Sequence, residues 1–226
     1  MKHRRKILFT ALLATSLLGG CGELPLEINQ TPENGYDLTY YGTTDVGAEI
    51  TFTDAARNEE KAIAEDGRFA IHVPRTTSKA SYEIIAKKEG EEATNSFTIP
   101  KQKTLVDYEV LKDQFTLPLP GAPQADTKVT TGFNIACDGN NVMAISLVYA
   151  PSTELDMGIY DYDNFQNAIE AVMRAVGSED KLDKVLDTFD ASHKKHSTTK
   201  VTVDHATYKF STDKSLDVTT LEIYPN

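Results

Sequence analysis

The first half of the chain alternates hydrophobic and polar residues with a period of two. Turn-forming pairs, Asp66-Gly67 and Glu89-Gly90, lie between the alternating stretches. The alternation is clearest in four segments, 50–53, 69–73, 82–84 and 97–99. Short period-two runs separated by glycine turns are typical of half-buried strands in a small sandwich. We therefore expect a β-sandwich over residues 36–100.

The second half mixes the two periods. Segments 128–137 and 141–150 flank an Asp-Gly-Asn turn and predict a hairpin, and segment 142–149 is apolar on both alternating faces except at Ser146. A strand that is apolar on both faces is typically central and covered on each side. Cys137 shares the alternating face of its strand with Phe133 and Ile135, so we expect a buried thiol.

Helical periodicity follows the predicted hairpin. Apolar residues recur at helical spacing from Phe165 to Val176, with Asp163 as the expected N-cap and Gly177 as the residue that ends the helix. A second helix is expected after Ser178. Further strands are expected at 200–204, 208–210 and 216–224. The fold class is therefore mainly β, a small β-sandwich followed by an α+β domain over residues 127–226 with a strand hairpin, two helices and further strands.

A proline-containing segment separates the two predicted domains. Residues 117–123 hold three prolines and a glycine, a composition that stiffens an extended spacer. We expect residues 101–126 to form the linker. Within it, residues 104–111 are compatible with one more strand or with an arm that packs against either domain.

The N-terminal 21 residues have the pattern of a secretory leader. Four basic residues precede an apolar run over 7–18, which is shorter than the roughly 20 residues that a spanning helix needs. The run is followed by Leu18, Gly19, Gly20 and Cys21. This segment resembles the lipobox of bacterial lipoprotein precursors. The resemblance implies a signal peptide over 1–20, cleavage before Cys21, and acylation of Cys21 with palmitate-type chains.

The lipobox resemblance also implies where the protein resides. Two or more acyl chains hold a protein stably on a membrane, so residues 21–35 are expected to be a lipidated tether. Gly22 stands where Gram-negative inner-membrane lipoproteins carry an aspartate. Two extracytoplasmic locations therefore stay open: the outer face of a Gram-positive plasma membrane and a Gram-negative outer membrane.

Three short motifs in the first predicted domain carry a second resemblance. They are Gly42-Thr43-Thr44, Val46-Gly47-Ala48 and Asp66-Gly67-Arg68-Phe69. In this order they resemble the bacterial Ig-like domains of surface proteins. The resemblance implies a β-sandwich and does not identify a ligand. Residues 127–226 resemble no family.

Two clusters of side chains are candidate metal sites. His193 and His196 are spaced to share one ion on a helix, and Asp161 and Asp163 carry oxygen ligands suited to calcium. A solvated helix end explains the histidines, and helix capping explains the aspartates. We therefore expect no metal and no cofactor.

The chemical motifs and the charge favour binding over catalysis. The sequence has no nucleophile elbow, zinc-protease helix motif or phosphate-binding glycine loop. A net charge of −11 argues against a nucleic-acid partner. We expect a non-enzymatic lipoprotein of the cell envelope, a binding, adhesion or structural module whose partners are the membrane and a cell-wall or envelope protein or glycan. The alternative is an envelope enzyme or enzyme inhibitor with its site in the C-terminal domain.

Overall fold

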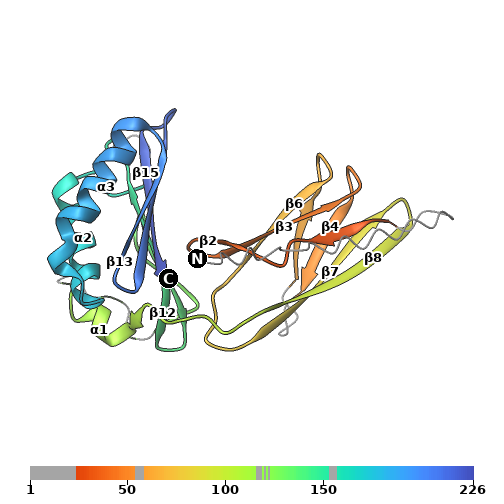
Figure 1. Ribbon diagram of the computed structural model, residues 1–226, viewed down its shortest axis with the longest axis horizontal. Coiled ribbons are helices and arrows are strands. Elements are labelled where there is room, and N and C mark those ends of the chain that lie inside the picture. Colours follow the sequence, from red (N-terminus) through yellow and green to blue (C-terminus); the bar gives the residue numbers. More distant parts are fainter. Residues whose placement is uncertain (1–23, 54–58, 116–118, 120, 122, 153–156) are drawn as a thin grey trace, which may run out of the picture.

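The protein has two separate hydrophobic cores along its long axis (Figure 1). The computed structural model describes residues 24–53, 59–115, 119, 121, 123–152 and 157–226. One core is built from residues between Leu24 and Ile99, and the other from residues between Leu105 and Ile223. The fold is mainly β, with a small α+β part, as the sequence predicts.

The first domain is a sandwich of two antiparallel sheets. Side chains from both sheets, including Tyr40, Ile71, Ile84 and Phe97, share one core. In the first sheet, β1 (Leu26–Ile28) and β2 (Glu33–Asn34) pair with one edge of β3 (Leu38–Thr44), and β6 (Arg68–Val73) pairs with the other. The second sheet has the order β5 (Glu59–Ile63), β4 (Glu49–Thr53), β7 (Ala80–Lys88), β8 (Glu91–Ile99).

The segment predicted to be a tether is part of this sandwich over its described residues. Leu24 is only 4% exposed and lies in the core, and Leu26 pairs with Thr44. Asn95 Nδ2 also donates a hydrogen bond to the Leu26 carbonyl oxygen, 3.2 Å away. The prediction of an irregular tether over 21–35 is therefore wrong for residues 24–35. Strands of two and three residues flanked by Pro25 and Pro32 are too short to show a period in the sequence.

The second domain is built on one antiparallel sheet of seven strands. Its order is β10 (Asp126–Thr130), β11 (Phe133–Asp138), β12 (Asn141–Tyr149), β15 (Val218–Pro225), β14 (Ala206–Asp213), β13 (Thr198–Val203), and β9 (Val106–Asp107) pairs with the start of β12. The position of β12 at the centre confirms the prediction from its apolar faces. The predicted strand 128–137 is divided in two by a turn at Gly132, whose φ is +78° and where a Cβ would lie 2.6 Å from Gly158 Cα.

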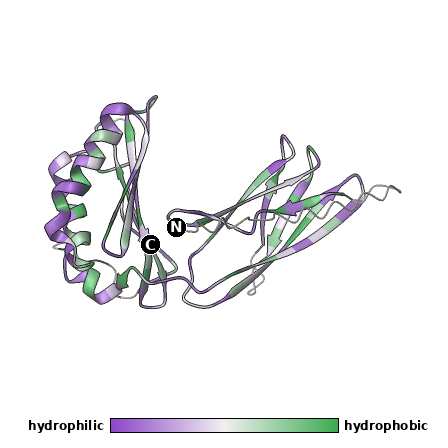
Figure 2. Cartoon of the chain, viewed as in Figure 1, coloured by the Kyte–Doolittle hydropathy of each residue, from purple (hydrophilic) through white to green (hydrophobic). Residues whose placement is uncertain are grey.

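Helices cover one face of this sheet and leave the other open toward the first domain (Figure 1). The helices are α1 (Tyr108–Lys112), α2 (Tyr162–Ala175) and α3 (Leu182–Lys195), with a 3₁₀ turn (Glu179–Lys181) before α3. Figure 2 shows hydrophobic and hydrophilic residues mixed along α2 and α3, as expected for helices that bury one side. Phe165 and Phe189 are the large buried aromatic residues on these helices. Among the described residues, no helix is long and apolar enough to cross a membrane.

The ends of α2 correct one prediction and confirm another. Asp161 is the N-cap, since its carboxylate accepts the Asn164 backbone N–H at 2.9 Å, whereas Asp163 lies inside the first turn. The prediction of Asp163 as the cap is therefore wrong by two residues. At the other end Gly177 has a φ of +71°, and the Ser178 N–H bonds to the Met173 carbonyl oxygen at 2.9 Å. This geometry is a Schellman motif.

The segment after residue 100 belongs to the second domain rather than to a linker. Leu105, Tyr108 and Leu111 are buried in its core, and α1 lies against α2. Both alternatives left open for residues 104–111 are found: β9 adds a short strand to the sheet, and the rest forms an arm that packs on the second domain. The prediction of a linker over 101–126 is wrong for residues 105–115, where three well-spaced apolar side chains anchor a short helix.

Candidate functional site

The two domains meet at the tip of the β2–β3 hairpin, which contacts the open face of the second sheet (Figure 1). A cavity of about 450 Å³ lies at this junction, and we call it the interdomain cleft. Both domains line it, the first with Glu33, Asp37 and Tyr41 among others, the second with Asp126, Lys209 and Glu222. The cleft is polar, unlike the two cores on either side of it.

One wall of the cleft is a row of polar side chains across the second sheet. Direct pairing places Asn134 beside Ser146, Ser146 beside Glu222, and Glu222 beside Lys209. Lys200 on β13 continues the row, opposite Lys209. Directly paired residues in neighbouring strands project from the same face. The strand register therefore gathers donors and acceptors that are far apart in the sequence.

Lys209 joins the two domains electrostatically. Its Nζ lies 3.2 Å from Glu33 Oε1 of the first domain and 3.2 Å from Glu222 Oε2 of its own sheet. Tyr41 Oη donates a hydrogen bond of 2.9 Å to the other oxygen of Glu33. The bond from Tyr41, followed by the contact with Lys209, lowers the pKa of Glu33. Burial opposes the charge of Lys209, but the two glutamates outweigh it and raise the pKa of Lys209.

Tyr36 is the main contact of the hairpin with the second domain. Its Oη donates a hydrogen bond of 2.7 Å to Asp126 Oδ1, and its backbone N–H donates one of 3.3 Å to Glu222 Oε1. Burial, and then the bond to Asp126, raise the pKa of the Tyr36 hydroxyl, which keeps it a donor. Gly35 makes this approach possible, because a Cβ there would lie 3.0 Å from Glu222 Oε2.

Tyr36 also has an apolar seat on the sheet. Its side chain packs against a small cluster of buried residues, Ala136, Ala144 and Tyr224. Two alanines in neighbouring strands leave room for the inserted tyrosine ring. The ring of Tyr36 therefore packs on the face of the sheet beside these small side chains.

Asp37 is the least satisfied carboxylate in the cleft. It is half-buried, and none of the described residues donates a hydrogen bond to its side chain. Burial raises the pKa of Asp37, His72 and Arg75 oppose that effect, and the charges of Asp126 and Glu222 add to it. The cleft thus holds a carboxyl group that takes up a proton more readily than usual.

The residues of the cleft are suited to hydrogen bonding. Carboxylates, an ammonium, two amides and hydroxyls line the cleft, and Tyr41, which also lines it, is 48% exposed. Thr39 Oγ1 and His72 Nδ1 form another polar pair, 3.1 Å apart, and His72 is exposed. Such a surface fits a ligand with many hydroxyl groups.

The histidines proposed as weak metal candidates come together at one end of α3. His193 Nε2 and His196 Nδ1 lie 3.8 Å and 3.9 Å from Asp217 Oδ1, a partner that the sequence analysis missed. His193 Nδ1 is also hydrogen-bonded to Thr219 Oγ1 at 3.0 Å. Across the residues that the structure describes, no group of three or more such side chains is arranged to hold a metal ion.

The other predicted site residues are placed as follows. Asp161 caps α2 and Asp163 is exposed on its first turn, so each has a local role. Cys137 is 8% exposed, and burial, followed by the charge of Asp126, raises the pKa of its thiol to about 11. A thiol with this pKa is protonated and unreactive at neutral pH. Leu18, Gly19, Gly20 and Cys21 lie outside the described residues.

Sequence reasoning missed the residues that line the cleft. The one available signal is the alternation of buried Tyr208, polar Lys209 and buried Phe210, which marks Lys209 as belonging to the polar face. The pairing with Glu33 depends on how the two domains dock, which no local pattern encodes.

No family model matches the chain, and no curated protein or solved structure is significantly similar to it. The function is therefore inferred from these residues themselves.

Proposed function

We propose that this protein is a lipid-anchored, extracytoplasmic lipoprotein that acts as a binding or adhesion module of the cell envelope, without catalysis. Its partner is a cell-wall or envelope protein or glycan, engaged at the interdomain cleft. The proposal rests on the position of the first described residues, which join the first domain far from the second domain.

The chain enters the first domain at the end remote from the second. Leu26 lies opposite Thr44, the last residue of β3, whereas Leu38 at the start of β3 lies opposite Asn34. The β2 end of the strand is the one that contacts the second domain, through Glu33 and Lys209. Leu24 and Pro25, which directly precede Leu26, therefore lie at the opposite end of the sandwich.

This entry point matches what an acyl anchor at Cys21 requires. Leu24 is the third residue after Cys21 in the sequence, a reach of about 10 Å when extended. Acyl chains on Cys21 would hold the outer end of the sandwich close to the membrane. The nine-residue strands β7 and β8 span about 30 Å, so the cleft would be displayed roughly one domain length from the lipid surface.

The composition of the cleft supports a binding role. Its carboxylates and hydroxyls are positioned to bond a hydroxyl-rich ligand, while Tyr36 is held as a donor and Cys137 as a neutral thiol. Neither group is activated for nucleophilic attack.

Replacing the lipobox cysteine tests the anchor. In cells given labelled palmitate, Cys21→Ala is expected to lose the label and move from the membrane fraction to the soluble fraction. The matched control is Cys137→Ala, which removes the other cysteine and is expected to keep both label and membrane location. Equal labelling and equal membrane retention of Cys21→Ala and the unmodified protein would contradict the proposal.

A further inference from the structure

A second pocket opens at the interdomain junction, and its charge is opposite to that of the cleft. Its volume is about 450 Å³, and Asn34 belongs to both cavities. Four cationic side chains line it, and we call it the basic pocket: Arg75, Lys101, Lys103 and Lys200. Such a concentration of positive charge is unexpected in a protein with a net charge of −11.

Arg75 is a buried guanidinium with unused donors. The residue is 4% exposed, and Nε donates to the Gly35 carbonyl oxygen at 3.0 Å while Nη2 donates to Asn34 Oδ1 at 3.1 Å. Its guanidinium lies 5.0 Å from the centre of the Tyr224 ring, a cation–π contact. A guanidinium has five N–H donors, so described residues leave three unused. No fully buried side-chain nitrogen among the described residues lacks a partner, so Nη1 is not fully buried, and Arg75 is one of the residues that line the pocket.

The lysines around Arg75 are also largely unneutralised. Lys200 lies directly opposite Lys209 in the sheet, an arrangement of like charges that is destabilising by itself. Lys209 is balanced by Glu33 and Glu222, but no described carboxylate lies within ion-pair distance of Lys200 or Lys101. Lys103 Nζ donates a hydrogen bond to the main-chain oxygen of Asn226 at 2.7 Å.

We infer that the basic pocket binds a phosphate group, carried by a small molecule or by a lipid headgroup. A fixed guanidinium offers planar, paired donors, and lysines add mobile positive charge, the combination that suits a multiply charged oxyanion. Thr202 and Thr207 add hydroxyl groups on the same wall. The volume of the pocket exceeds that of a phosphate ion, so it accommodates the group to which the phosphate is attached.

A purely structural role explains only part of this arrangement. Holding the hairpin requires the two hydrogen bonds of Arg75 and its stacking on Tyr224. It does not require Lys101 or Lys200, which contact no described acid, nor a cross-strand pair of lysines. A bound anion accounts for all of these features because it neutralises the charges that the protein leaves unpaired.

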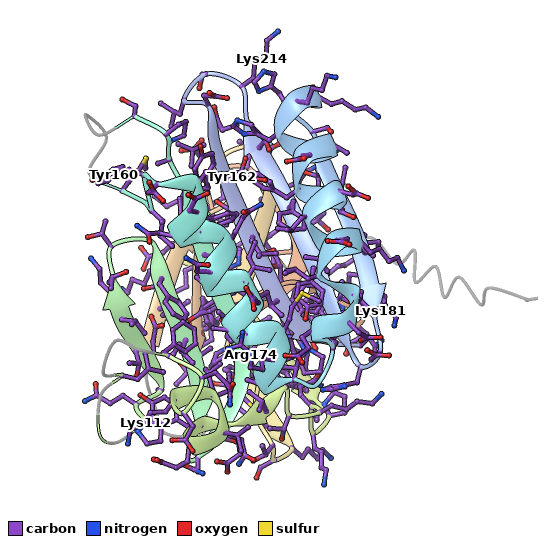
Figure 3. All side chains as sticks on the ribbon, turned by 90° about the vertical axis from the view of Figure 1, so that its left-hand side faces the viewer. Lys112, Tyr160, Tyr162, Arg174, Lys181 and Lys214 are labelled. Atoms are coloured by element: carbon purple, nitrogen blue, oxygen red, sulfur yellow. The ribbon has the colours of Figure 1, made fainter. Side chains whose placement is uncertain are left out.

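The test measures binding of inorganic pyrophosphate to the purified full-length protein by titration calorimetry. The variant is the double substitution Lys101→Glu and Lys200→Glu, chosen because neither side chain has a hydrogen bond or ion pair with described residues. We expect its affinity to fall at least about tenfold, since two charge-assisted contacts become repulsive. The matched control, Lys194→Glu with Lys214→Glu, makes the same charge change at the far end of the second domain, where Figure 3 shows Lys214. It is expected to stay within about threefold of the unmodified protein.

Three outcomes would overturn the inference: no binding of pyrophosphate at millimolar concentration, equal losses in the variant and the control, or no loss in the variant. Two further titrations distinguish the source of the phosphate. Short-chain phosphatidylglycerol below its micellar concentration is compared with inorganic phosphate, and short-chain phosphatidylcholine measures the contribution of the acyl chains. The compound that binds the unmodified protein more tightly, and that loses affinity for the double variant, identifies the natural class of phosphate.

Discussion

The interdomain cleft and the basic pocket are built on the same hairpin, yet they treat charge in opposite ways. In the cleft, Lys209 lies between Glu33 and Glu222, and the Tyr36 hydroxyl is bonded to Asp126. In the pocket, cations crowd together with few acids among the described residues to balance them. In the cleft, most polar groups are hydrogen-bonded or ion-paired within the protein. In the basic pocket, several cationic groups have no acidic partner among the described residues.

This difference separates groups whose bonds within the protein also help to hold the domains together from groups that have no ion-pair partner among the described residues. Hydrogen bonds satisfied within the protein contribute to stability, whereas unsatisfied donors near a cavity cost stability until a ligand fills them. Substitutions in the cleft should therefore lower the stability of the junction. Substitutions of Lys101 or Lys200 in the pocket should leave stability nearly unchanged and alter binding.

The largest effect is expected from Tyr36→Ala. It removes the ring from its seat on Ala136 and Ala144 and the bond to Asp126, and losing a largely buried aromatic ring costs about 2–4 kcal/mol. We expect the two domains to unfold in separate calorimetric transitions and the radius of gyration in solution scattering to increase.

Tyr36→Phe is the matched control for this prediction. It keeps the ring and loses only the hydroxyl, so the cost should be about 1 kcal/mol and the domains should stay coupled. If Tyr36→Ala unfolded in the same single transition as the unmodified protein, the hairpin would not be what joins the domains.

A pair of neighbouring lysines gives the sharpest contrast between the two sides. Lys209→Met leaves Glu33 and Glu222 without their shared cation, and we expect a loss of about 1–2 kcal/mol in the free energy of unfolding. Lys200→Met, on the adjacent strand, removes a repulsive neighbour and should change stability by less than about 0.5 kcal/mol. Urea denaturation measures both. Equal losses would mean that Lys200 is as well paired as Lys209.

The elements of the fold that depend on local pattern were predictable. The sandwich strands, the central position of β12 and the end of α2 at Gly177 follow from alternation, two-sided apolarity and a glycine in the left-handed region. The short strands β1 and β2 were not, because their two or three residues gain stability only from pairing with β3. The arm with α1 was left open for the same reason: its burial depends on a core assembled by distant strands.

The candidate site was almost wholly beyond the sequence. Arg75 follows a strand and a proline with nothing to mark it as buried, and its partners Gly35, Asn34 and Tyr224 are 40 or more residues away. The histidines were predicted to be close, but Asp217 comes from the β14–β15 turn, which only the sheet register places beside α3. Contacts between domains depend on how two folded surfaces dock. The periodicity of hydrophobic residues and the spacing of motifs in the sequence do not predict that docking.

The smallest expected effect concerns the unsatisfied carboxyl of the cleft. Burial raises the pKa of Asp37 in the folded protein, so the folded state binds this proton more tightly than the unfolded state. The free energy of unfolding therefore falls as the pH rises from the pKa of an unfolded aspartate through the raised pKa of Asp37. At neutral pH the ionised carboxylate destabilises the folded protein. Asp37→Asn removes the cost, and we expect a gain in the free energy of unfolding at pH 7 that disappears below the pKa of an ordinary aspartate.

The groups that face Asp37 make this result specific to the cleft. Asp126 and Glu222 repel its charge, and His72 and Arg75 attract it. Urea denaturation of both proteins from pH 3.5 to pH 7.5 measures the difference. Asp187→Asn, at an exposed position of α3, is the control for removing a carboxylate outside the cleft. A constant difference for Asp37→Asn would show that the cleft already satisfies this carboxylate, and the contrast between its paired and unpaired groups would then lie wholly in the basic pocket.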